Sequence, residues 1–198
     1  MPSPTKRAAT SLIASLESMT TIVADTGDMN LIKKYTPTDA TTNPSLIYKA
    51  ALMPEYAPFI TDSITYARGK SSSPSDVLSL TMDYLSCKIG AEIAGIVPGY
   101  ISTEVDARLS FDTAGTIAKA LSLIEIYETL GVDKSKVLIK IASTWEGIQA
   151  AKVLQVRSVA LLARERLTQC CSASLLLDIF SSLSPPCPLP VFVFTNLY

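Results

Sequence analysis

The chain has 198 residues, 48% of them hydrophobic, and a formal net charge of −1. This is the composition of one core-forming domain of ordinary size. A net charge so close to zero gives no electrostatic basis for binding nucleic acid or an anionic membrane. No apolar run approaches the roughly 18 residues that a membrane-spanning helix needs.

The residue types present also restrict the chemistry. The sequence has no His, and its four Cys show no C-x-x-C spacing. Ser-His-Asp and Cys-His catalysis and most zinc sites are therefore excluded, and we expect no metal. The Cys are typical of free thiols in a reducing compartment. Because the N-terminal segment lacks the apolar region and cleavage site of a signal peptide, we expect a cytoplasmic protein.

Strand and helix patterns alternate along the first three quarters of the chain. The predicted strands are 20–24, 38–42, 100–105 and 136–142. The predicted helices are 11–18, 29–34 with Asp28 as its cap, one opened by Asn43 and Pro44, 55–68, 75–96, and one capped by Asp112 and ended by Gly131. Such alternation predicts an α/β fold built from βα units, with a parallel sheet and helices outside it.

Two finer features accompany these elements. The last predicted helix carries an apolar stripe of Ala114, Ile117, Leu121, Ile124 and Tyr127. A loop at 69–74 separates the two preceding helices. We expect Tyr100 and Trp145 to pack rather than to react.

The composition changes near residue 148. All eight Gly lie at or before Gly147, whereas residues 148–198 contain none and hold three of the four Cys. The βα rhythm is also lost there, in an irregular segment rich in Leu, Ser and Ala. We therefore divide the chain into residues 1–154, with about four βα units, and an unrelated tail at 155–198.

Lys140 is the most informative residue, because it stands alone in the apolar run 137–142. Such runs suit strands buried on both faces of a parallel sheet. A buried ammonium is costly, and desolvation favours the neutral amine, a nucleophile that can form a Schiff base with a carbonyl. A lone Lys is also typical of an edge strand with a solvated head.

Four polar residues share one placement at strand ends: Asp25, Asn43, Glu104 and Lys140. Catalytic groups of (β/α) barrels gather at the C-terminal ends of the strands. Alternation groups Lys140 with Leu138 and Ala142 on one face, and Glu104 with Ser102. Each residue also has a plainer interpretation. Asp25 suits a turn, Asn43 suits a helix cap, and Glu104 would reach Arg108 four residues later if the chain turned helical.

Longer motifs surround these residues. They are residues 23–28 (VADTGD), 39–46 (DATTNPSL), 101–110 (ISTEVDARLS) and 138–147 (LIKIASTWEG). Together, in this order and spacing, they closely resemble the transaldolase family from about Ser11 to about Leu154.

The resemblance implies a cofactor-free (β/α)8 barrel, a TIM barrel, that transfers a dihydroxyacetone unit between sugar phosphates in the non-oxidative pentose phosphate pathway. Lys140 matches the Schiff-base lysine, and Glu104 matches the carboxylate that shuttles protons through a water. Asp25 matches the acid–base of carbon–carbon cleavage, and Asn43 matches a residue that binds substrate hydroxyls. The implied substrates are sedoheptulose 7-phosphate, glyceraldehyde 3-phosphate, fructose 6-phosphate and erythrose 4-phosphate. A homodimer is left open.

The resemblance stops after Leu154. The Ser and Arg that hold the substrate phosphate in the family, and the Thr that positions the catalytic water, have no match in 155–198. The alternative interpretation is therefore a catalytically inactive truncated fragment that lacks the phosphate-binding half of the site. We expect little or no turnover from this chain.

Overall fold

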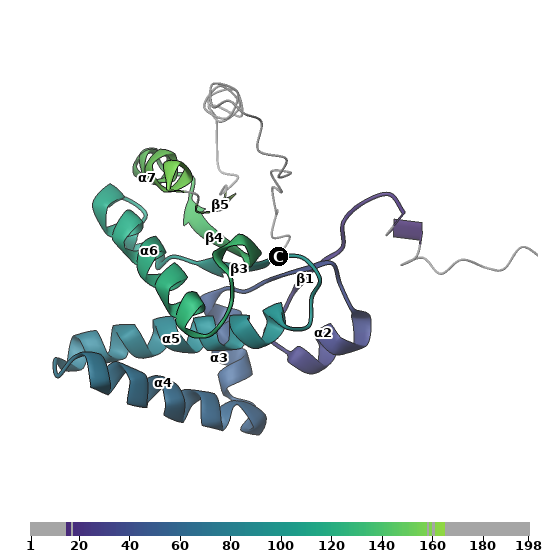
Figure 1. The fold of residues 1–198 in the computed structure, drawn as a ribbon, viewed down its shortest axis with the longest axis horizontal. Helices are drawn as coiled ribbons and strands as arrows, with labels where there is room; N and C mark the ends of the chain where they lie inside the picture. Colours follow the sequence, from purple (N-terminus) through teal and green to yellow (C-terminus); the bar gives the residue numbers. More distant parts are fainter. Residues whose placement is uncertain (1–14, 17, 158, 160, 165–198) are drawn as a thin grey trace, which may run out of the picture. The chain divides into compact units, whose positions relative to one another are not determined.

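The computed structural model describes residues 15–16, 18–157, 159 and 161–164 (Figure 1). The chain divides into two compact units. The first comprises Met1–Thr103 with Ile126–Val137, and the second comprises Glu104–Glu125 with Leu138–Tyr198. Most of the helix expected at 11–18, and most of the tail expected from residue 155, lie outside the described residues.

Helices alternate with short strands in the first unit. In order, its elements are β1 (Val23–Asp25), α2 (Met29–Tyr35), β2 (Asp39–Thr41), α3 (Pro44–Ala51), the 3-10 turn η1 (Pro54–Tyr56), α4 (Ala57–Lys70), α5 (Pro74–Ala94) and most of β3 (Ile101–Glu104). The strands β1, β2 and β3 are consecutive and parallel. Val23 is in register with Asp39, and Thr41 with Ser102.

The later elements continue the alternation. They are η2 (Ala107–Leu109), α6 (Thr113–Thr129), η3 (Lys134–Lys136), β4 (Val137–Ala142), α7 (Trp145–Val156) and β5 (Leu161–Arg164). The strands β4 and β5 are parallel, with Lys140 in register with Leu162. Parallel strands that alternate with helices confirm the predicted α/β class and are the repeating unit of a TIM barrel.

Strand β5 was not predicted from the sequence. Its residues belong to a short apolar run, which periodicity alone does not assign to a strand or to a helix. The structure shows that the βα rhythm continues past Leu154 at least as far as Arg164.

Side-chain caps explain why several helices begin where they do. The Asp28 carboxylate accepts from the backbone N–H groups of Asn30 and Leu31, and the Asn43 side chain accepts from Leu46 N–H. The Thr144 hydroxyl accepts from Gly147 N–H at the start of α7. These bonds satisfy backbone donors that have no partner within the helix. The predicted caps at Asp28 and Asn43 are thus confirmed.

The helices α4 and α5 lie side by side (Figure 1), with the rings of Tyr66 and Tyr84 stacked at 4.2 Å between centroids. The expected loop at 69–74 is shorter than predicted. Gly69 stays within α4, and the loop comprises residues 71–73 before Pro74 opens α5. Glycine is tolerated near the end of a helix, so its presence did not mark the boundary.

The buried stripe of α6 overlaps the predicted one only in part. Ile124 and Tyr127 are buried as predicted, whereas Ala114 is exposed and Ile117 and Leu121 are half-buried. Thr116, Ala120 and Leu123 are buried in their place. Both stripes have helical spacing, but the observed one includes a Thr, which a search for apolar residues omits. The Thr116 hydroxyl donates to Leu109 C=O, so its burial leaves no unsatisfied polar group.

Cys87 is not part of a disulfide, as the sequence predicts, and its side chain is buried. The other three Cys lie outside the described residues. Within the described part of the chain, no helix is long and apolar enough to span a membrane.

Candidate active site

Lys140 lies in the middle of β4, where its residue surface is only 8% exposed. The predicted alternation is visible in burial. Val137, Ile139 and Ile141 are almost fully buried, whereas the flanking residues of the other face, Leu138 and Ala142, are half-buried. Lys140 therefore lies on the same face of the strand as Leu138 and Ala142, as predicted. The edge-strand alternative with a solvated head is wrong in this structure.

Glu104 is the acidic partner of Lys140. One carboxylate oxygen of Glu104 lies 4.0 Å from Lys140 Nζ, and the two side chains are only 12% and 10% exposed. The backbone supports this placement, because Val105 N–H donates to Lys140 C=O at 2.9 Å. The structure thus brings together two of the four predicted site residues.

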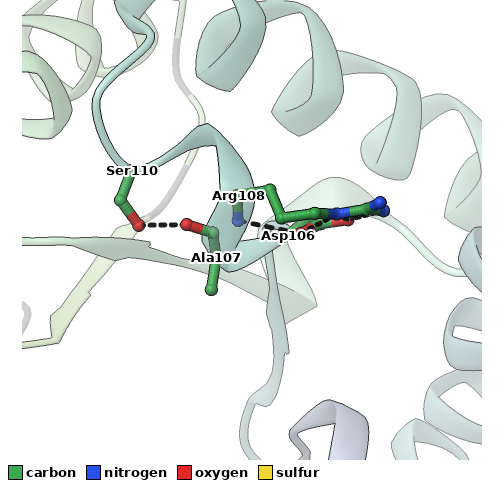
Figure 2. Close-up of polar contacts among 4 residues, drawn as sticks. All are labelled: Asp106, Ala107, Arg108 and Ser110. Atoms are coloured by element: carbon green, nitrogen blue, oxygen red, sulfur yellow. Dashed lines mark hydrogen bonds and ion pairs between the residues drawn. The ribbon is translucent and has the colours of Figure 1, made fainter.

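The alternative partner of Glu104, Arg108, is engaged elsewhere. Arg108 Nε donates to both carboxylate oxygens of Asp106, at 3.1 and 3.0 Å, and Figure 2 shows the two side chains in contact. Hydrogen bonding to Arg108 lowers the pKa of Asp106 below its ordinary value. The Arg108 guanidinium is therefore held by Asp106, the residue that caps η2.

The backbone of η2 is fixed by further polar contacts. Ser110 Oγ donates to Ala107 C=O at 2.6 Å (Figure 2). The Thr144 hydroxyl donates to Ser110 C=O, and the Thr113 hydroxyl donates to Glu146 C=O at 3.0 Å. The segments that follow β3 and β4 are therefore tied together beside the Lys140–Glu104 pair.

The opposite face of β3, which carries Thr103, lies toward helices α6 and α5. Thr103 Oγ1 is hydrogen-bonded to the hydroxyl of Tyr127 on α6, and a Cβ at Gly90 on α5 would lie only 1.9 Å from that hydroxyl. Burial raises the pKa of Tyr127 well above its ordinary value. Because successive side chains alternate in a strand, Glu104 belongs to the face opposite Thr103.

Asp25 ends β1, in register with Thr41 at the end of β2, and its side chain is exposed. The loop after it has defined geometry. Asp28 N–H donates to Thr26 Oγ1 at 3.1 Å, and the hydroxyl of Tyr56 donates to Gly27 C=O at 2.8 Å. Asp25 is thus presented at the C-terminal end of its strand, as predicted.

Asn43 lies two residues beyond β2, and its Oδ1 accepts from Leu46 N–H at 3.0 Å. Its interpretation as a helix cap is confirmed. The same bond fixes the direction of the carboxamide, and a role in binding a ligand through the amide NH2 stays a prediction.

The four predicted residues are divided between the two compact units. Asp25 and Asn43 belong to the first unit, and Glu104 and Lys140 to the second. The convergence of all four at one sheet face stays a prediction.

The hydroxyl of Tyr56 was not predicted from the sequence, because a contact across 29 positions leaves no local signal. Trp145 was expected to pack, but this side chain is 63% exposed at the start of α7. In the part of the chain that the structure describes, no group of three or more His, Cys, Asp or Glu side chains is arranged to hold a metal ion.

Comparison with known proteins decides the family. The family Transaldolase/Fructose-6-phosphate aldolase matches residues 22–163, which is more than half of the chain. The chain belongs to this family. The match extends past Leu154 and ends within β5.

Individual relatives are also similar. A transaldolase of Alteromonas mediterranea is 57% identical over 147 residues, which is 74% of this chain and 46% of that protein. A probable transaldolase of Drosophila melanogaster is 53% identical over 150 residues, covering 76% and 45%. Transaldolase B of Pasteurella multocida is 56% identical over 145 residues, covering 73% and 46%. The chain thus spans a little less than half the length of these relatives.

Proposed function

We propose that this chain carries the Schiff-base chemistry of a transaldolase, with Lys140 as nucleophile and Glu104 as its proton-transfer partner. The observation that supports this most directly is the Lys140–Glu104 pair, 4.0 Å apart and largely removed from water. A buried ion pair contributes little net stability, because desolvation offsets most of the attraction between the charges. Its placement, with Glu104 at the end of β3 and Lys140 within β4, in a chain of this family, points to chemistry instead.

In the first step, the amine of Lys140 attacks the carbonyl carbon of a ketose. Glu104 first takes a proton from the Lys140 ammonium, which frees the amine, and passes this proton to the carbonyl oxygen as the amine attacks. It then takes a second proton from the attached nitrogen and gives it to the new hydroxyl, which leaves as water. The nitrogen keeps its third proton, so a protonated imine remains. A separation of 4.0 Å is longer than a direct hydrogen bond and suits transfer through one bridging water.

In the second step, the carboxylate of Asp25 takes the proton of the C4 hydroxyl. The C3–C4 bond breaks, an aldose phosphate leaves with a new carbonyl at C4, and the electron pair moves into the imine to give an enamine. Attack of the enamine on a second aldose phosphate reverses these steps. The amide NH2 of Asn43, oriented by the bond from Leu46 to its Oδ1, donates to a hydroxyl of the bound dihydroxyacetone unit.

We assign the chain the substrates of the family reaction. They are sedoheptulose 7-phosphate, glyceraldehyde 3-phosphate, fructose 6-phosphate and erythrose 4-phosphate, used without a cofactor in the cytoplasm. The first half of the barrel, expected to end at Leu154, would continue through β5 to Arg164, and a separate tail would begin only after that strand. A homodimer is one assembly to test.

The deciding experiment traps the imine. Purified protein is incubated with fructose 6-phosphate and borohydride, and peptides are analysed by mass spectrometry. We expect a sugar adduct on Lys140 alone, its loss in Lys140→Met, and no loss in the control Lys152→Met, since Lys152 is exposed on α7. Glu104→Gln should slow adduct formation by about 10²-fold, the usual contribution of a positioned acid–base.

The competing proposal is a catalytically inactive member of the family. It follows from the missing sequence match to the phosphate-binding residues. If no adduct forms with folded protein, or if the adduct forms on another lysine, the enzyme proposal is wrong and the inactive family member stands.

A further inference from the structure

We propose that Tyr56 is a positioning residue for Asp25, acting through the loop that follows β1. This inference rests on the proposed function, because Asp25 matters only if the chain cleaves a carbon–carbon bond. It concerns a side chain far from Asp25 in sequence that the reaction itself does not use.

The phenol oxygen of Tyr56 holds the loop at two points. It donates to Gly27 C=O at 2.8 Å and accepts from Met29 N–H at 3.0 Å. A hydroxyl has one proton to donate and lone pairs to accept, so both bonds form at once. The two backbone groups that Tyr56 contacts belong to Gly27 and Met29, on either side of Asp28. They lie two and four residues after Asp25.

Tyr56 is well suited to hold that backbone. The residue is completely buried on η1, and its ring packs edge-on against Phe59 with centroids 5.7 Å apart. Burial raises the pKa of the phenol above its ordinary value, so the hydroxyl keeps the proton that it donates to Gly27. A second contact from η1 reaches the same region, where Asn30 Nδ2 donates to Glu55 Oε1 at 3.2 Å.

The loop is also enclosed on its other side. A Cβ at Gly27 would lie 3.1 Å from Ala50 Cβ and 3.1 Å from Leu46 C=O, both on α3. The backbone of Gly27 is therefore held between η1 and the helix that Asn43 caps. One packed arrangement thereby fixes the loop after Asp25 relative to the start of α3.

Such fixation matters for the cleavage step. Asp25 is exposed at the end of a three-residue strand, so the following loop is a main constraint on where its carboxylate points. Displacement of a reacting group by about 1 Å can cost 10²-fold in rate. Formation of the imine at Lys140 does not use Asp25 and should not respond.

The test separates these two steps in Tyr56→Phe, which keeps the ring and removes only the hydroxyl. After incubation with fructose 6-phosphate and borohydride, a six-carbon phosphate adduct on Lys140 reports imine formation. A three-carbon adduct reports cleavage. We expect the six-carbon adduct to form within about twofold of the parent rate, and the three-carbon adduct to form about tenfold to a hundredfold more slowly. Parent-like formation of both adducts would overturn the inference.

Amide hydrogen exchange provides a measurement that does not depend on activity. We expect faster exchange in residues 26–30 of Tyr56→Phe. The control Tyr127→Phe removes an equally buried hydroxyl that is bonded to Thr103, and should leave residues 26–30 at the parent rate. Parent-like exchange of this loop in Tyr56→Phe would refute the positioning role whatever the activity.

The two measurements also distinguish the inference from the function on which it rests. If the parent protein traps no adduct, the proposed function fails, and exchange in residues 26–30 alone decides whether Tyr56 holds the loop. If the parent protein traps only the six-carbon adduct, the cleavage role of Asp25 is wrong. Hydrogen exchange in residues 26–30 then again decides whether Tyr56 holds the loop.

Discussion

Lys140 and Glu104 form a pair whose presence is easier to explain by chemistry than by stability. Replacing a buried ion pair with apolar side chains of similar volume is often neutral or stabilising, whereas removing one partner leaves an uncompensated charge. The two residues are 4.0 Å apart and almost buried, so this distinction applies to them.

The pair gives a prediction about stability and activity together. We expect Lys140→Met to lower the free energy of unfolding by up to about 3 kcal/mol, because Glu104 is left without its nearest cation. The double variant Lys140→Met with Glu104→Met should recover most of that loss and still form no adduct. Urea unfolding and borohydride trapping measure the two properties. A double variant less stable than Lys140→Met alone would show that the pair contributes net stability.

Tyr127 gives a prediction about alkaline pH. An unfolded Tyr ionises near a pKa of about 10, whereas burial raises the pKa of Tyr127 well above that value in the folded chain. Above pH 10 the unfolded state has therefore lost a proton that the folded state keeps. The stability contribution of Tyr127 is fully present below pH 10 and falls by about 1.4 kcal/mol per pH unit above it.

Tyr127→Phe isolates this contribution. At pH 8 the variant should be less stable than the parent by about 1 kcal/mol, because buried Thr103 Oγ1 loses its hydrogen-bond partner. At pH 11 the difference should shrink or change sign, because Phe does not ionise. Urea unfolding of both proteins at the two pH values measures this. An equal difference at both values would contradict the prediction.

At the scale of elements, local signals in the sequence located the helix starts better than the helix ends. Asp28 and Asn43 were recognisable because a capping side chain acts on backbone groups two or three residues away. The end of α4 and the buried stripe of α6 were placed less well. Gly69 is compatible with helix or loop, and the burial of Thr116 depends on a bond to Leu109 that only tertiary structure reveals.

Asn43 allows its two roles to be separated. Asn43→Asp keeps an oxygen acceptor for Leu46 N–H but lacks the amide NH2 group, whereas Asn43→Ala lacks both. We expect Asn43→Ala to lose about 1 kcal/mol of stability and Asn43→Asp to stay within about 0.5 kcal/mol of the parent. Both should weaken the binding of fructose 6-phosphate, measured as the concentration that gives half-maximal trapping. Unchanged trapping in Asn43→Asp would leave Asn43 with a capping role only.

At the scale of the whole molecule, the alternation of strand and helix patterns predicted the parallel α/β architecture, and alternation within strands predicted the faces on which Lys140 and Glu104 lie. Strand alternation has a period of two, so a short stretch of sequence assigns side chains to faces. Local sequence patterns could not indicate the proposed positioning role of Tyr56. That role depends on packing of η1 against a loop that lies 27 to 31 positions earlier in the chain. Strand β5 was not predicted, because periodicity alone does not assign such a short apolar run to a strand or to a helix.

At this scale we also predict how strongly the chain prefers a phosphorylated sugar over an unphosphorylated one. A working phosphate site makes several charge-assisted hydrogen bonds of about 1.5–3 kcal/mol each, so two of them favour a phosphorylated sugar by roughly a hundredfold or more. In the second unit, the guanidinium of Arg108, four residues after Glu104, is already held by Asp106. The sequence also shows no match to the Ser and Arg that bind phosphate in the family.

We therefore expect the chain to trap fructose and fructose 6-phosphate on Lys140 at rates within about tenfold of each other. We also expect turnover with fructose 6-phosphate and erythrose 4-phosphate to lie well below that of full-length relatives, since remote phosphate binding helps to position the reacting carbons. Competition between the two ketoses in one trapping reaction measures the first expectation directly, and a coupled assay measures the second. A preference above a hundredfold for the phosphorylated sugar, or turnover within about tenfold of a full-length relative, would mean that the chain contains a phosphate site that its sequence does not reveal.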